Sequence, residues 1–116
     1  MTQPTTIDLS LFDKLKRDVG EDYIGELIDT YLADTPKTLE IIRKALAEGK
    51  IDEMRLAAHA IKSTSATFGA AQFSALAKDL EMLGKSNTLT GAADLFKSLE
   101  SQYPQVARDL RKLRGE

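Results

Sequence analysis

Residues 51–70 read IDEMRLAAHAIKSTSATFGA, and they carry the most informative pattern in the chain. Apolar and small side chains recur there every three or four residues, which is the spacing of one buried helix face. Asp52 and Glu53 favour the positive N-terminal end of a helix, and Gly69 is typical of the residue that ends one. We therefore predict a helix over residues 51–68 with a buried face formed by Ile51, Met54, Ala58, Ile61, Ser65 and Phe68.

The same helical spacing continues on both sides of this segment, and no stretch alternates as a strand would. Pro36 is expected in the first turn of a helix of its own, because proline is common there. A kink or break is expected near Tyr103, because Pro104 lies inside a helical pattern. In the first helix, Leu11, Phe12 and Leu15 are expected to face inward. The predicted helices are residues 9–19, 22–33, 36–48 (with Gly49 ending it), 51–68, 71–83 and one that begins near Ala92 and ends near Leu113.

Short connections between consecutive helices favour antiparallel neighbours. The predicted fold is therefore all-α: an antiparallel up-and-down four-helix bundle with one or two short additional N-terminal helices. Residues 1–6 are expected to form a flexible N-terminal tail, and residues 7–116 a single domain. We interpret the apolar seam of the last helix as bundle core rather than as a dimeric coiled coil, which predicts a monomer.

Composition excludes several classes of function. Sixteen basic and 18 acidic residues give a formal net charge of −2, which does not favour nucleic acid as a partner. The chain has no cysteine, so a disulfide framework and thiolate metal sites are excluded. No apolar run approaches the roughly 20 residues that a membrane span needs. A cytoplasmic protein without a membrane partner is the expectation.

His59 is the only histidine of the chain, and it lies off the apolar face of its predicted helix. Lys62 and Ser63, three and four residues further on, are its neighbours on the helix surface, and Ala66 is two turns away. A neutral imidazole is a good nucleophile near pH 7. If it were phosphorylated, Lys62 would offset the new charge as a mobile cation, and Ser63 and Ala66 would leave room for a partner to approach.

Leu56, three residues before His59, is on the same polar side of the helix. It is either a single exposed leucine, which needs no explanation, or an apolar contact for a docking partner. A metal site is not expected, because one histidine without cysteine or clustered carboxylates lacks ligands.

The segment from Ala58 to Ala70 resembles the signature of histidine-phosphotransfer (HPt) domains. That signature is an Ala-His pair, an aliphatic residue, Lys, several small residues, a bulky apolar residue and Gly. The resemblance implies a hairpin of helices 51–68 and 71–83 that displays His59. It also implies that Lys62 lies near the phosphate and that Glu81 hydrogen-bonds the histidine. The less favoured alternative for Glu81 is a solvated surface charge. Ser63 departs from the glycine that is common at its position.

By this resemblance His59 would exchange a phosphoryl group with the aspartate of a receiver domain, in a response regulator or a hybrid histidine kinase. The chain would be a phosphocarrier without autonomous kinase activity and would bind no cofactor, while a magnesium ion is expected on the receiver. The alternative is an interaction or inhibitor module that kept the bundle but carries no phosphate. The intact Ala58-His59 pair and Lys62 argue against that alternative, because such a module does not need them.

Overall fold

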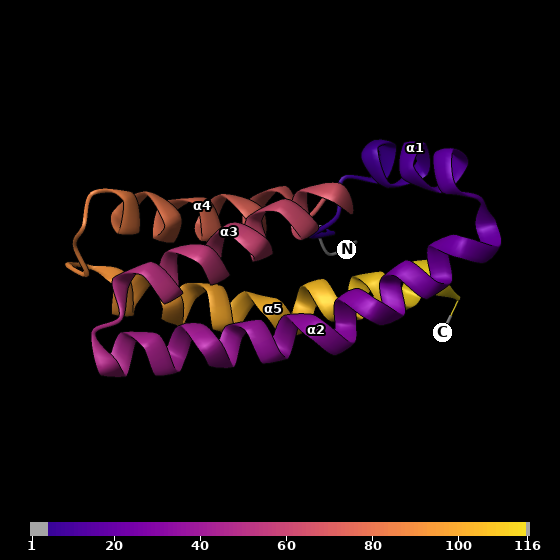
Figure 1. Cartoon of the computed structure of the whole chain (residues 1–116). Helices are drawn as coiled ribbons and strands as arrows, with labels where there is room; N and C mark the ends of the chain where they lie inside the picture. Colours follow the sequence, from indigo (N-terminus) through magenta and orange to yellow (C-terminus); the bar gives the residue numbers. More distant parts are fainter. Residues whose placement is uncertain (1–4, 116) are drawn as a thin grey trace.

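The computed structural model describes residues 5–115, and within them the chain forms five α-helices and no strand. Four long helices lie side by side in an antiparallel bundle, and one short helix lies beside one end of it (Figure 1). The predicted fold class is confirmed, with one short N-terminal helix added to the four. The helices are α1 (Leu9–Val19), α2 (Glu21–Glu48), α3 (Ile51–Thr67), α4 (Ala71–Lys85) and α5 (Ala92–Arg114).

The helix α2 replaces two helices of the sequence prediction, and the predicted break before Pro36 is wrong. Proline removes the N–H that would bond the carbonyl of Leu32, four residues earlier. The hydroxyl of Tyr103 on α5 donates to that carbonyl over 3.5 Å, so the oxygen keeps a partner, although a long one. Tyr31, Thr35 and other side chains on both sides of Pro36 are buried, and this packing favours one continuous helix.

The helix α5 also continues through its proline, from Ala92 to Arg114. Of the kink or break that the sequence predicts near Tyr103, the break is therefore not met. Pro104 is exposed, whereas Leu99, Val106 and Leu110 on the inner side of the same helix are fully buried. The apolar seam packs into the bundle core and holds the helix together across the proline.

The residues just before α1 are attached to the bundle, although residues 1–6 were predicted to be a flexible tail. Residues 1–4 lie outside the described part of the chain. Thr6 donates its backbone N–H and its hydroxyl to the Oδ2 atom of Asp109 on α5, both over 2.8 Å. Ile7 is 1% exposed in the core. The buried carboxylate of Asp109 and the buried side chain of Ile7 cause this anchoring. The polar composition of residues 1–6 did not indicate it.

The contact between α1 and the turn after α3 fixes the end of the bundle nearest the N-terminus. Asp8 caps α1, because its carboxylate accepts from the backbone N–H groups of Ser10 and Leu11. Its own N–H donates to the carbonyl of Gly69 over 2.8 Å. Gly69 has φ +86°, and a Cβ there would lie 2.8 Å from the carbonyl oxygen of Asp8, so this turn requires glycine.

One orientation in α1 differs from the sequence prediction. Phe12 is buried as expected, but Leu11 is 47% exposed. The helix α1 packs against α2 and α3 at the end of the bundle, and Phe12 is its one fully buried residue. The Leu11 side chain turns instead toward the outer surface of the α3–α4 pair, where it lines a groove.

Candidate functional site

His59 lies in the middle of α3 with 54% of its side chain exposed, as its position off the apolar face predicts. The buried face of the helix turns Met54, Ala58, Ile61 and Ser65 into the core. The polar member of that face, Ser65, is satisfied by a 2.7 Å hydrogen bond with the hydroxyl of Tyr31. Packing on that face therefore determines which way His59 points.

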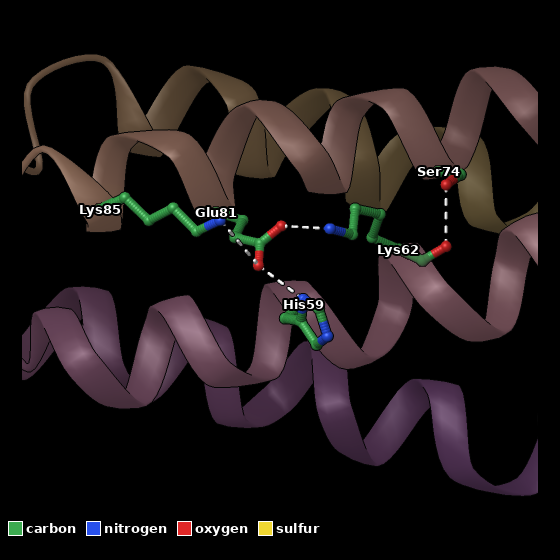
Figure 2. A network of polar contacts seen from close by, with 5 residues as sticks. All are labelled: His59, Lys62, Ser74, Glu81 and Lys85. Carbon is green, nitrogen blue, oxygen red and sulfur yellow. Dashed lines mark hydrogen bonds and ion pairs between the residues drawn. The ribbon is translucent and has the colours of Figure 1, made fainter.

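Glu81 on α4 provides the direct partner of the histidine ring. Its side chain is only 4% exposed, so the alternative of a solvated surface charge does not hold. The Oε2 atom lies 2.6 Å from Nδ1 of His59, and Oε1 accepts from Nζ of Lys62 over 2.6 Å. Lys85 brings a second ammonium group to 3.9 Å from Oε2. Figure 2 shows His59 and Lys62 reaching the carboxylate from α3 on two sides.

Lys62 differs from the sequence expectation of a mobile cation beside the histidine. Its ammonium group is held by the buried carboxylate, and its side chain is 27% exposed. The hydrogen bond from Lys62 is the main reason why the pKa of Glu81 is lowered. Burial of the carboxyl raises this pKa, but the bonds from Lys62 and His59 together outweigh the burial. Glu81 is therefore ionised at neutral pH.

The charge of Glu81 determines which nitrogen of His59 carries the proton. An ionised carboxylate can only accept hydrogen bonds, so the ring must donate from Nδ1. In the neutral imidazole this leaves the lone pair on Nε2, which points away from Glu81 in Figure 2. The arrangement thus presents a nucleophilic nitrogen on the outer side of the ring.

Two residues of this site were missed by the sequence analysis. Ser74 on α4 donates its hydroxyl to the backbone carbonyl of Lys62 over 2.8 Å, which ties the two helices together beside the site. Lys85 adds positive charge at the carboxylate. Both lie on the side of α4 that carries Glu81, at spacings of seven and four residues from it, and this helical spacing is the signal that could have found them.

Ser63 and Ala66 line an open groove of about 530 Å³ between α3 and α4. Small side chains form most of its wall, and the lysines at positions 62 and 78 are its charged members. Leu56 does not belong to this groove: it is 60% exposed, one turn before His59. The groove-lining residues are Leu11, Lys62, Ser63, Ala66, Gly69, Ala71, Ser74, Ala75 and Lys78.

Within residues 5–115 there is no group of three or more carboxylate or histidine side chains placed to hold a metal ion. In the same part of the chain, no helix combines the length and the apolar character that crossing a membrane requires.

Comparison with known proteins agrees with this geometry. The family model of the Hpt domain matches residues 26–114, so the chain belongs to the Hpt domain family. The fold is similar to the crystal structure of histidine-containing phosphotransfer protein B (HptB) from Pseudomonas aeruginosa PAO1. The TM-score is 0.90 and the sequence identity 25%, and the match covers 97% of this chain and 96% of that one. None of the curated proteins compared with the chain matches it significantly.

Membership of this family supports a histidine phosphotransfer role in a phosphorelay. Proteins of the family are phosphocarriers that interact with receiver domains. The family match begins at Glu26, so α1 lies outside the matched range.

Proposed function

We propose that this chain is a cytoplasmic phosphorelay intermediary in two-component signalling that carries a phosphoryl group on His59. The observation that carries the proposal is the pairing of a half-exposed imidazole with a buried, ionised carboxylate at 2.6 Å. The carboxylate keeps the proton on Nδ1, and the outer nitrogen, Nε2, is left as the nucleophile.

In the proposed transfer, the Nε2 lone pair attacks the phosphorus of an aspartyl phosphate on a receiver domain. The bond between phosphorus and the aspartate oxygen breaks, and the free carboxylate leaves with the electron pair. The phosphorylated ring keeps its Nδ1 proton, and its positive charge is balanced by Glu81 over the existing hydrogen bond. The reverse steps deliver the group to the aspartate of a second receiver, so no water is consumed.

The surroundings of His59 have supporting roles in this proposal. Lys62 holds Glu81 and places positive charge near the incoming phosphate. Ser63 and Ala66 keep the approach to the ring open, because in-line transfer requires the two proteins almost to touch. Leu56 adds an exposed apolar contact one turn before the ring.

The partners in this proposal are receiver domains of response regulators or hybrid histidine kinases. A magnesium ion bound by the receiver would neutralise the phosphoryl oxygens, and we expect this chain to bind no cofactor. The carrier acts as a monomer. It has no kinase activity of its own, because the sequence contains no glycine-rich nucleotide loop.

The test is to mix the protein with a phosphorylated receiver domain and to measure acid-labile phosphate on the chain. Wild type should become labelled, whereas His59→Gln should not. Label retained on His59→Gln would refute the assignment of the site. Wild type that binds the receiver without accepting phosphate would instead show an interaction module, and label from ATP alone would show a kinase.

A further inference from the structure

The helices α3 and α4 approach each other closely at Gly84, one turn after Glu81. A Cβ atom built on Gly84 would lie 2.6 Å from Cβ and 3.0 Å from Cγ of Arg55 on α3. Gly84 has no positive φ, so its backbone conformation does not require glycine. The need for glycine here comes from the close approach of the helices.

This contact lies beside the His59–Glu81 pair. Gly84 follows Glu81 by three residues, and Arg55 precedes His59 by four, so in an antiparallel hairpin the two pairs occupy neighbouring turns. The spacing of the helices at Gly84 therefore sets the spacing at the site.

The size of the effect follows from ordinary contact distances. Carbon atoms in contact lie about 3.5 Å apart, so a methyl group at position 84 would push the helices apart by about 0.9 Å. A rotamer change cannot remove this contact, because Cβ of Arg55 is fixed by the backbone. The 2.6 Å bond between His59 and Glu81 would then exceed the roughly 3.2 Å limit of a good hydrogen bond.

His59 and Lys62 differ in how they can respond to such a separation. The imidazole is attached through one methylene group and cannot extend toward α4. The lysine has a flexible four-carbon stem and can follow the carboxylate. A wider hairpin would therefore break the bond to His59 while the bond to Lys62 survives.

We propose that Gly84 is a positioning residue, which sets the spacing of α3 and α4 so that Glu81 can hold the Nδ1 proton of His59. This rests on the proposed role of His59 as phosphate carrier, although the state of the ring can be measured without any transfer. Gly84 contacts neither the ring nor the phosphate and acts only through the separation of the helices.

The experiment compares Gly84→Ala with the double variant Gly84→Ala/Arg55→Gly, which removes the two side-chain atoms that the new methyl group would meet. Gly25→Ala is the matched control: Gly25 also lies inside a helix, and its Cβ would meet only the flexible end of Arg114 at 3.4 Å. The tautomer of His59 is measured by ¹⁵N NMR, which is unambiguous because the chain has one histidine. Phosphorylation by a small phosphoramidate donor is measured alongside.

We expect wild type and Gly25→Ala to show the Nδ1–H tautomer, and Gly84→Ala a mixture of tautomers. Phosphorylation of Gly84→Ala should be slower by roughly two- to fivefold, because a ring without its orienting partner divides between the two tautomers and only one of them has a free Nε2. The double variant should recover both the tautomer and the rate.

A wild-type tautomer in Gly84→Ala would overturn the proposal, whether or not the variant is less stable. If Gly84→Ala does not fold, the proposal is tested on the double variant alone. A folded double variant with the wild-type tautomer supports the proposal, whereas one that is unfolded or has mixed tautomers overturns it. If wild type shows the Nδ1–H tautomer but accepts no phosphate from any donor, the proposed function fails while the positioning of the ring stands.

Discussion

Replacing Glu81 by glutamine should impair His59 more than replacing it by alanine. The sequence alone favours the opposite order, because an amide oxygen can still accept a bond from the ring. In the structure, however, the carboxylate accepts from two donors at once, Nδ1 of His59 and Nζ of Lys62, each over 2.6 Å. A glutamine has one oxygen for these two donors, and its amide NH₂ group must face the other.

The charge of Lys62 determines which of the two donors the amide oxygen accepts from. A hydrogen bond to a charged group contributes about 1.5–3 kcal/mol and a neutral one about 0.5–1.5 kcal/mol, so the amide oxygen should turn to Lys62. The NH₂ group then donates to Nδ1, and the proton of the ring moves to Nε2. A preference of about 1–1.5 kcal/mol reduces the tautomer with a free Nε2 by roughly five- to tenfold. In Glu81→Ala neither tautomer is imposed, so the loss should be smaller.

The assay is phosphorylation of His59 by a small phosphoramidate donor, together with the ¹⁵N spectrum of the ring. The expected order of rates is wild type, then Glu81→Ala, then Glu81→Gln. Adding Lys62→Met to Glu81→Gln should return the ring to the Nδ1–H tautomer in the ¹⁵N spectrum, because the amide oxygen is then free to accept from Nδ1. A Glu81→Gln variant with the wild-type tautomer and rate would refute the reasoning.

Three other outcomes are expected. Ala66→Arg should strongly slow transfer from a receiver but not labelling by a small phosphodonor. The control Ala47→Arg, on the exposed surface of α2, should affect neither rate. If the receiver reacts with Ala66→Arg as fast as with wild type, the docking surface lies elsewhere. Because the pKa of Glu81 is lowered in the folded protein, its ionised form contributes stability above the unfolded pKa, and this is lost as pH falls through the folded value. The stability difference between wild type and Glu81→Gln in urea unfolding should therefore shrink below about pH 4.5, and a constant difference would contradict the link. Pro36→Ala should raise stability by about 1–3 kcal/mol in the same assay, since it restores an N–H for the carbonyl of Leu32, and destabilisation would show that the proline is required.

Much of the fold could be predicted because it depends on local periodicity. The bounds of α1, the extent of α3 and the exposure of His59 all follow from a spacing of 3.6 residues per turn. The continuity of α2 could not be predicted in this way. It depends on packing around Pro36 and on the hydroxyl of Tyr103, which comes from a different helix. Local rules for proline omit such partners.

In the site, too, relations within one helix could be predicted, whereas contacts between helices could not. His59, Lys62, Ser63 and Ala66 lie on one helix, so their relation could be worked out from spacing alone. The hydrogen bond of Glu81 was implied only by family resemblance, because it depends on how α4 is aligned against α3. The burial of Glu81 and the fixed position of Lys62 were not foreseen, since both arise from the same inter-helix contact.

That alignment is maintained on both sides of the carboxylate. Toward the start of α4, the hydroxyl of Ser74 binds the backbone carbonyl of Lys62, and toward its end Gly84 packs against Arg55. Glu81 lies between these two contacts, so α4 cannot slide along α3 without breaking one of them. An imidazole on a single methylene group cannot compensate for such a slide. The two flanking contacts, rather than Glu81 alone, therefore determine whether the outer nitrogen of His59 is the nucleophile.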